Sequence, residues 1–427
     1  MLQHSKFLMR LLLKPIIEYG FQIFSTSSIS SLEQLNKVQT SAARIIAGLR
    51  NSCPNDIAQF EAGLIPLKCK RKCPMNNYLN RLRSYESNHR TANYIKSWKS
   101  NQRLKKESPL CGALRCDMFK FDVEPTSPFF TINPIIDLSN VHFNRELAFK
   151  ISKGNDKQIL MKMLGLEMLS SIPPEATRIF TDGSKLENGS CGSGSVIFRP
   201  NKEPINISRR TPNHSSSYRA ELIAILDSLR VIGNNEKEVW LMTDSLSALQ
   251  YLENFYEVRG TTAVAIVEEL ERLSRFFPVH LVWIPSHVGL AGNELADGLA
   301  RAGCDQPLVG DNLLTYSEIG SIYKKTAIDL SPPQHSWYGA KKPGEILKLR
   351  LCREDQTALS RFRTGHTKSL MFEAGTKLFP DCPNCRGGAQ ASPEHILHCL
   401  GLTWEDVNED PLLFLDFLRV THIMELV

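Results

Sequence analysis

The chain is organised around the stretch Arg178-Ile179-Phe180-Thr181-Asp182-Gly183-Ser184, an apolar run that ends at a carboxylate and a small-residue turn. Acidic residues beside small residues recur downstream in Arg219-Ala220-Glu221, Thr243-Asp244-Ser245 and Gly292-Asn293-Glu294-Leu295-Ala296-Asp297. A histidine follows another apolar run in Trp283-Ile284-Pro285-Ser286-His287. Acidic residues at strand ends or on helices form the pattern expected when carboxylates must converge on divalent metal ions.

The same segment alternates between strand-like and helix-like patterns. Apolar runs predict strands at 177–181, 193–198, 204–208, 238–243 and 279–284. Helical spacing of apolar residues predicts helices after Ser217, at 245–252, before residue 279 and at 292–302. Three strands followed by alternating helices and strands predict an α/β fold, a mixed five-stranded sheet with helices against it.

The length of the chain, 427 residues, exceeds one ordinary domain, and a composition of 42% hydrophobic and 22% charged residues is that of a globular protein. We expect a helical region at 1–75, a connecting region at 76–172, the sheet domain at 173–306 and a basic helical region at 307–427. Ser171-Ile172-Pro173-Pro174 reads as the linker that precedes the sheet domain. The connecting region carries no interpretable pattern.

Charge is distributed unevenly along the chain. Residues 176–305 hold 13 Lys and Arg against 16 Asp and Glu, whereas the remainder holds 38 against 29. An acidic centre between basic arms suits a metal-dependent enzyme that acts on a polyanion, and scattered solvated lysines are the alternative. The candidate C-terminal arm contains six basic residues: Lys348, Arg350, Arg353, Arg361, Arg363 and Lys368.

Four residues near the C-terminus have the spacing of a tetrahedral zinc site, Cys-x2-Cys followed by His-x3-Cys. They are Cys382, Cys385, His395 and Cys399, with His398 as an alternative to His395. A structural Zn²⁺ here would fold a small unit that we expect to lack enough core of its own. The tail after Leu400 is expected to pack back as a helix. The other close cysteine pairs are too isolated to define a metal site: Cys69 with Cys73, and Cys111 with Cys116.

Eleven cysteines, dispersed and odd in number, do not form the framework of a secreted disulfide-rich protein. We therefore expect an intracellular protein, nuclear or cytoplasmic, and not a secreted one. No stretch reaches the roughly 18 to 20 consecutive apolar residues of a membrane span, so no membrane partner is expected.

The five motifs of the sheet segment, in this order, closely resemble the ribonuclease H domain of non-LTR retrotransposons. The resemblance implies an endonuclease that cleaves the RNA strand of RNA–DNA hybrids by a two-metal mechanism, leaving 3′-hydroxyl and 5′-phosphate ends. It implies that two Mg²⁺ or Mn²⁺ ions are held by four carboxylates: Asp182, Glu221, Asp244 and Asp297. It assigns His287 to proton transfer or product release. The partner would be an RNA–DNA hybrid, recognised by shape and by its 2′-hydroxyls.

Four neighbouring residues are weaker candidates. Ser184 and Asn293 are candidates for positioning the hybrid or a ligand. Glu294 is expected to cap its helix or face solvent. Arg219 either contacts phosphate or pairs with an acidic neighbour.

Two flanking regions also resemble parts of retroelement proteins. The run Leu13-Lys14-Pro15-Ile16-Ile17-Glu18-Tyr19-Gly20, with Leu35-Asn36-Lys37-Val38-Gln39 and Ala43-Arg44-Ile45-Ile46, resembles the C-terminal tail of a reverse transcriptase. No aromatic-x-Asp-Asp polymerase motif occurs, so this remnant would not copy nucleic acid. Apolar residues at helical spacing predict an amphipathic helix here: Leu32, Leu35, Val38, Ala42 and Ile45. The Cys-Cys-His-Cys spacing resembles the element that follows ribonuclease H in related proteins.

Two other functions share these features. A non-catalytic nucleic-acid-binding remnant of a retroelement polyprotein would keep the motifs without using them. A nuclease of the same fold that acts on DNA would use the same carboxylates. Cleavage of hybrid beside duplex DNA distinguishes them.

Overall fold

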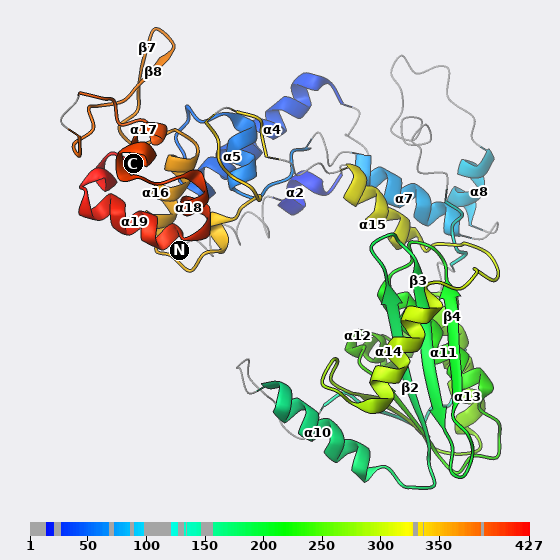
Figure 1. Ribbon diagram of the computed structural model, residues 1–427. Helices are drawn as coiled ribbons and strands as arrows, with labels where there is room; N and C mark the ends of the chain where they lie inside the picture. The colour runs from blue at the N-terminus through cyan, green and yellow to red at the C-terminus, as the bar shows by residue number, and fades with distance from the viewer. Residues whose placement is uncertain are drawn as a thin grey trace. The chain divides into compact units, whose positions relative to one another are not determined.

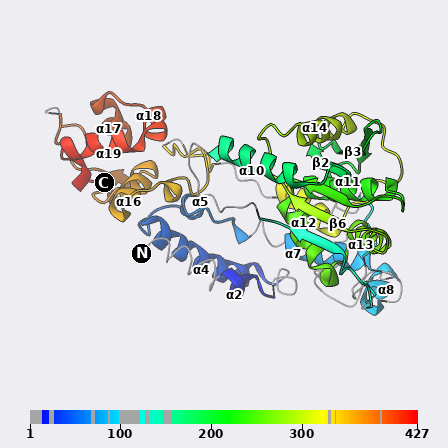
Figure 2. The ribbon, with the colours of Figure 1, turned by 90° about the horizontal axis from the view of Figure 1, so that it is seen from below.

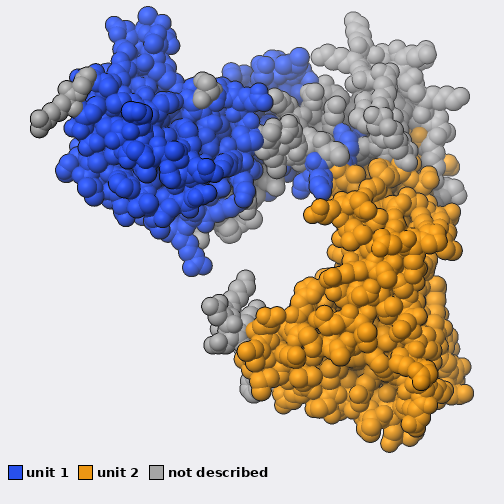
Figure 3. All heavy atoms as spheres, in the orientation of Figure 1, with its two compact units in different colours: residues 1–76, 101–115, 323–427 blue, residues 77–100, 116–322 orange. Residues whose placement is uncertain are grey.

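The computed structural model describes residues 14–20, 27–67, 72–85, 89–97, 121–126, 132–133, 135–146, 157–327, 332–335, 337–385 and 388–427. They divide into two compact units, coloured separately in Figure 3. The sheet unit contains the described residues of 77–100 and 116–322, and the helical unit contains those of 1–76 and 323–427. Among the described residues, no helix is both long enough and apolar enough to span a bilayer.

The sheet unit is built on six strands in the order β1-β6-β5-β2-β3-β4. The strands are β1 (Val141–Asn144), β2 (Thr177–Lys185), β3 (Cys191–Phe198), β4 (Ile205–Thr211), β5 (Val239–Thr243) and β6 (Val279–Trp283). Strands β2, β5, β6 and β1 pair in parallel, and β3 is antiparallel to both β2 and β4. The predicted mixed α/β sheet is therefore confirmed, with one strand more than the five expected. The additional strand, β1, comes from the connecting region and extends the sheet beside β6.

Helices cover both faces of this sheet, as Figures 1 and 2 show. One face packs against α11 (Ser217–Val231), α12 (Leu246–Glu253) and α13 (Thr261–Ser274), which share a hydrophobic core with the strands. The other face packs against α10 (Lys157–Ser171) and α14 (Ala291–Gly303). Successive strand residues point to opposite faces, so Ile179 belongs to the first core and Phe180 to the second.

The remaining elements of the sheet unit are short or shared with the neighbouring segment. They are α8 (Arg90–Ser97), η3 (Phe255–Glu257), and the greater parts of α7 (Lys72–Ser84) and α15 (Tyr316–Ala327). A single β-bridge between Val123 and Leu314 joins the chain before the sheet to the chain after it.

The helical unit combines the two ends of the chain. Its N-terminal elements are α2 (Lys14–Glu18), α4 (Ile29–Ala47) and α5 (Asn55–Glu61). Its C-terminal elements are η4 (Ile346–Lys348), α16 (Arg353–Arg363), β7 (Met371–Glu373), β8 (Thr376–Leu378), α17 (Pro393–Leu400), α18 (Trp404–Glu409), α19 (Pro411–Val420) and η5 (Ile423–Glu425). Helices α4 and α5 share a core with residues such as Trp337 and Leu347, so segments about three hundred positions apart in the sequence pack together.

The helix predicted in the N-terminal region is present as α4, but its buried face is not the predicted one. Val38 and Ile45 are 48% and 68% exposed. The buried face instead carries Gln39, Ala43 and Ile46. Gln39 is buried because its amide donates to the backbone oxygen of Ile65. Polar residues with buried partners therefore shift the face that apolar spacing alone predicts.

The basic C-terminal stretch is largely structural and not a free arm. Arg353 donates to the carbonyl oxygens of Ile45 and Ile46, and Arg361 donates to that of Gly48. Guanidinium groups at these carbonyls satisfy and neutralise the negative end of α4. Arg363 is buried and pairs with glutamates of its own unit. Three of the six basic residues of the candidate arm are therefore engaged within the helical unit.

The C-terminal region has a hydrophobic core that extends well beyond the candidate zinc element, so the small unit expected to lack enough core of its own packs on a larger one. Phe362, Ile396 and Phe414 are among the fully buried members of a cluster that draws on α16, α17 and α19. The tail after Leu400 packs back as predicted, since Leu415 and Leu418 of α19 close this core.

His366 makes the stability of the helical unit sensitive to acid. Burial, with Lys377, Arg50 and Arg44 nearby, lowers the pKa of this histidine to about 4 from an ordinary 6.5. The folded state favours the neutral ring, so the stabilisation is complete above pH 6.5 and is lost as the pH falls toward 4. We expect the free energy of unfolding of the parent to fall between pH 7.5 and pH 4.5 by about 2 kcal/mol more than that of His366→Gln, measured by urea unfolding. Equal losses in both proteins would contradict this.

Candidate active site

Three of the predicted carboxylates meet at one edge of the sheet. Asp182 lies in β2, and Asp244 directly follows β5, the parallel neighbour of β2. Glu221 comes from α11, which crosses behind β2. Each residue offers one carboxylate oxygen, and these oxygens all lie within 4.8 Å of one another. Adjacent parallel strands about 4.8 Å apart bring side chains at their carboxyl ends together.

A glycine permits the approach of Glu221 to Asp182. A Cβ at Gly183 would lie 2.4 Å from the backbone nitrogen of Glu221 and 2.9 Å from the Cβ of Ala220. Any larger residue would push α11 away from β2. The Asp182-Gly183 motif thus supplies both a carboxylate and the space for the next one.

Burial and mutual repulsion raise the pKa values of the three carboxyl groups and so disfavour their ionised forms. Desolvation, reinforced by the charges of Asp244 and Asp297, raises the pKa of Asp182. Desolvation and the charges of Asp182 and Asp244 raise the pKa of Glu221 well above its ordinary value. Burial also raises the pKa of Asp244. The ionised cluster is unfavourable by itself, and a bound cation would relieve it.

The donor set fits a hard divalent cation. Glu221 is buried, and its Oε2 atom has no hydrogen-bond partner among the described residues. A buried oxygen without a partner costs free energy unless an ion or water satisfies it. Carboxylate oxygens are the ligands that Mg²⁺ and Mn²⁺ prefer.

Asp297, the fourth predicted carboxylate, lies close by but is paired with another residue. It sits on α14, and its charge raises the pKa values of Asp182 and Asp244. Its Oδ1 atom accepts a hydrogen bond from Nε of Arg301 at 3.0 Å, and its Oδ2 atom lies 2.8 Å from Nη2 of Arg301 in an ion pair. The group of three carboxylates defined above does not include Asp297.

His287 lies on the exposed loop after β6, in a left-handed backbone conformation with φ of 53°. It is near enough to lower the pKa of Asp244 by its charge. Gln158 of α10 donates to the backbone oxygen of His287 at 3.0 Å. Nothing in the sequence near Gln158 indicates this contact, because a helix more than a hundred positions upstream supplies it.

The weaker candidates divide into two groups. Asn293 is buried and donates to the carboxylate of Asp244, while its Oδ1 atom has no partner among the described residues. Ser184 is half-buried on β2, and Glu294 is exposed on α14 as expected. Asn293 therefore orients a site carboxylate, and Glu294 faces solvent.

Arg219 is held by acidic neighbours. Its guanidinium lies 2.5 Å from Oε2 of Glu124 and 3.2 Å from Oε2 of Glu318. The side chains of Arg219, Glu124 and Glu318 are only 12%, 5% and 7% exposed. Glu318 also accepts from the backbone N–H and hydroxyl of Ser216, the N-cap residue of α11. Of the two alternatives left by the sequence, the ion pair is the one present.

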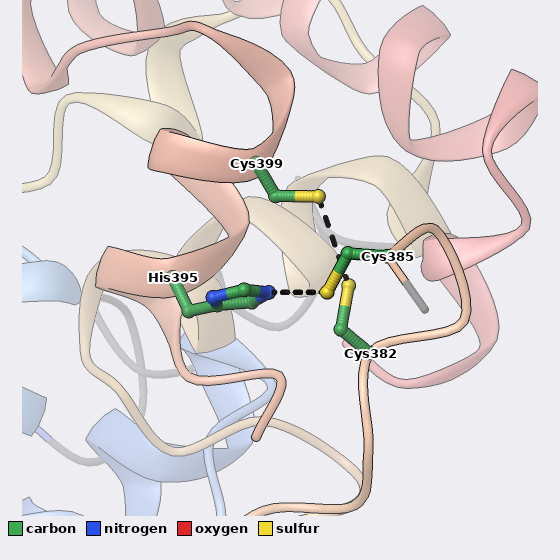
Figure 4. Close-up of side chains that lie close together, drawn as sticks. All are labelled: Cys382, Cys385, His395 and Cys399. Atoms are coloured by element: carbon green, nitrogen blue, oxygen red, sulfur yellow. Dashed lines mark hydrogen bonds between the residues drawn. The ribbon is translucent and has the colours of Figure 1, made fainter. Parts of the chain in front are cut away.

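The C-terminal cysteines and histidine also converge, as Figure 4 shows. Cys382 and Cys385 lie on the loop after β8, and His395 and Cys399 lie one turn apart on α17. The sulfur atoms of Cys382 and Cys399 are 4.0 Å apart, and Sγ of Cys385 lies 3.2 Å from Nε2 of His395. His398 is exposed and lies outside the group. Cys69, Cys111 and Cys116 and the side chain of Cys73 lie outside the described residues.

Similarity to known proteins falls on this part of the sheet unit. Residues 174–305 match the family model described as RNase H, which supports an RNase H domain in this part of the chain. Ribonuclease H1 of Mus musculus is 27% identical over 146 residues, which are 31% of this chain and 51% of the relative. Ribonuclease H1 of Homo sapiens is 30% identical over 144 residues, 30% of this chain and 50% of the relative.

The chain therefore spans about half the length of these curated relatives. Among solved structures, RNase H1 from the halophilic archaeon Halobacterium salinarum NRC-1 is 19% identical. Its alignment covers 30% of this chain and 98% of that chain, with a TM-score of 0.26.

Proposed function

We propose that this protein is a divalent-metal-dependent endoribonuclease that cleaves the RNA strand of RNA–DNA hybrids. The observation that carries the proposal is the convergence of the buried Asp182 and Glu221 with the half-buried Asp244, inside the segment that matches the RNase H family. The raised pKa values and the unpartnered oxygen of Glu221 give this cluster a reason to bind cations.

Each residue has a distinct part in the proposed reaction. Asp182, Glu221 and Asp244 would hold two Mg²⁺ or Mn²⁺ ions, which supply an activated water and stabilise the leaving oxygen of an in-line displacement. Asn293 keeps the carboxylate of Asp244 oriented. His287, which is exposed on the loop after β6, would exchange a proton with solvent or the departing strand. The carboxylate of Asp297 would contribute to the metal site once its contacts with Arg301 are broken.

The test is cleavage of an RNA–DNA hybrid labelled on each strand, by the full chain with Mg²⁺ or with EDTA. Duplex DNA and single-stranded RNA serve as parallel substrates. The proposal expects EDTA-sensitive cutting of the RNA strand of the hybrid alone. Hybrid binding without cutting would identify a non-catalytic remnant, and cutting of duplex DNA would identify a deoxyribonuclease.

We further propose a structural Zn²⁺ on Cys382, Cys385, His395 and Cys399. Two thiolates at about 2.3 Å from a tetrahedral ion lie about 3.8 Å apart, close to the 4.0 Å between Cys382 and Cys399. The Cys382 side chain is buried in the core of the C-terminal region, so the ion would tie the loop after β8 to α17. Thiolate ligands require a reducing setting, which agrees with an intracellular protein.

Replacing both Cys382 and Cys385 with serine is expected to remove this zinc. Two of the four ligands disappear, and hydroxyl groups are poor replacements for thiolates. Atomic absorption should give about one zinc per chain for the parent protein and none for the variant. Cys352→Ser, at an exposed cysteine outside the cluster, is the control. Equal zinc contents in all three proteins would refute the site.

The motif resemblance, the zinc-like element and the helical N-terminal segment together favour descent from a non-LTR retrotransposon. In this proposal residues 1–75 derive from a reverse transcriptase. Because Arg353, Arg361 and Arg363 serve the fold of the helical unit, contacts to nucleic acid would fall to other residues, such as Lys348 and Arg350.

A further inference from the structure

The pairing of Asp297 with Arg301 has a geometry that affects the candidate metal site. Arg301 follows Asp297 by one turn of α14, and its Nε and Nη2 atoms each reach one carboxylate oxygen. A charge-assisted hydrogen bond and a second close ion-pair contact therefore join the two side chains. Both oxygens of Asp297 are therefore engaged by a cation of the protein itself.

The helix that carries the pair packs closely against β3. A Cβ at Gly194 of β3 would lie 2.2 Å from the backbone nitrogen of Ala300 and 2.4 Å from the backbone oxygen of Ala296. Helix α14 is thus seated directly on the sheet. Side-chain rotation is the simplest way for Asp297 to change its partner.

The two members of the pair differ in exposure. The side chain of Asp297 is 16% exposed, whereas that of Arg301 is 63% exposed. Arg301 can therefore move into solvent when the pair breaks, and the carboxylate of Asp297 is then free to rotate toward the other carboxylates. Arg301 thus acts as a counter-ion of Asp297 that can be displaced.

We propose that Arg301 is a positioning residue that holds Asp297 away from the Asp182–Glu221–Asp244 cluster and so sets the affinity of the site for divalent ions. The inference rests on the proposed metal site. Ion binding must then release Asp297 from Arg301 before the fourth carboxylate can contribute an oxygen. The affinity for the ion is lowered by the free energy of that exchange.

The test is the binding isotherm of Mn²⁺ to the full, zinc-loaded chain without nucleic acid, followed by electron paramagnetic resonance. Arg301→Met removes both the charge and the contacts with the two oxygens of Asp297. Half-saturation should then occur at a lower Mn²⁺ concentration, by on the order of tenfold. Arg275→Met, which breaks a pair with Glu271 at the same helical spacing on α13, should leave the isotherm unchanged.

Arg301→Lys separates the contact from the charge. A lysine keeps the positive charge but cannot hold both oxygens of Asp297, so the proposal expects tighter Mn²⁺ binding than in the parent. In an Asp297→Asn background the Arg301→Lys change should have no effect. An isotherm for Arg301→Met equal to that of the parent would overturn the proposal. So would an Arg301→Lys isotherm equal to that of the parent while Arg301→Met binds more tightly, because that result leaves only a long-range charge effect.

Failure of the proposed function gives a different result. If the parent protein binds Mn²⁺ but does not cut the hybrid, the proposed nuclease function is wrong. The effect of Arg301 on Mn²⁺ affinity can still be tested in that case. If neither the parent nor Arg301→Met binds Mn²⁺, both proposals fall. Circular dichroism melting of each variant confirms that the fold is retained.

Discussion

Asp182→Asn is expected to lower the rate of hybrid cleavage by on the order of 10³-fold while hybrid binding persists. Metal ions contribute several kcal/mol to the transition state of such displacements, and each 1.36 kcal/mol is a tenfold change in rate. Asp182 interacts with all three other site carboxylates. The charges of Asp244 and Asp297 raise its pKa, and its own charge raises the pKa of Glu221. Contacts with substrate phosphates do not depend on this carboxylate.

The loss should not arise from unfolding. The pKa of Asp182 is raised in the folded state, so its ionised form destabilises the metal-free fold, and that cost grows as the pH rises through the folded pKa. An uncharged amide removes the cost, and the melting temperature of the metal-free variant at pH 8 should be no lower than that of the parent. Asp305→Asn, at an exposed position after α14, is the matched control with parental activity. Equal losses of binding and cleavage would contradict the assignment of Asp182.

Arg219→Ala is expected to destabilise the sheet unit by about 3–5 kcal/mol, because the change leaves two buried carboxylates without their cation. Glu124 and Glu318 reach Arg219 from segments before and after the sheet. For a unit of this size each kcal/mol corresponds to roughly 2–4 °C in melting temperature, so calorimetry should show a fall of roughly 10 °C.

Two comparison variants make this result specific. Arg275→Ala breaks an exposed pair within α13, and surface pairs of this kind contribute about 0.3–0.5 kcal/mol. Adding Glu124→Gln and Glu318→Gln to Arg219→Ala should recover part of the loss, because neutral amides are less costly to bury than unpaired charges. A loss below about 1 kcal/mol for Arg219→Ala would mean that the triad is not a buried ion-pair network.

The sheet and its carboxylates could be predicted because their signals are local. An apolar run that stops at Asp182, and another that stops at Asp244, fix both the strands and the edge at which the side chains emerge. The i, i+4 spacing of Asp297 and Arg301 was also open to prediction from the sequence, since such pairs face each other on a helix. The family motif itself contains only the carboxylate, so it does not indicate the pair.

Other features depend on contacts between distant segments, which no local pattern records. Strand β1 has four residues and is defined by its pairing with β6. Arg219 gives no sign in the sequence that Glu124 and Glu318 enclose it. The structural role of the basic residues at the C-terminus could not be predicted for a related reason. A count of arginines does not reveal that Arg353 and Arg361 point at the carbonyl end of α4.

The contact between Gln158 and His287 affects how far the chain can be shortened without disturbing the candidate site. Evolutionary similarity covers residues 174–305, yet α10, β1, Glu124 and Glu318 all lie outside those limits and hold the sheet unit together. A fragment trimmed to the similar region would keep every site carboxylate and lose the supports of the histidine loop and of Arg219. The matched region is thus smaller than the set of residues that pack in the sheet unit, and shortened versions of the chain should retain these outside residues as well.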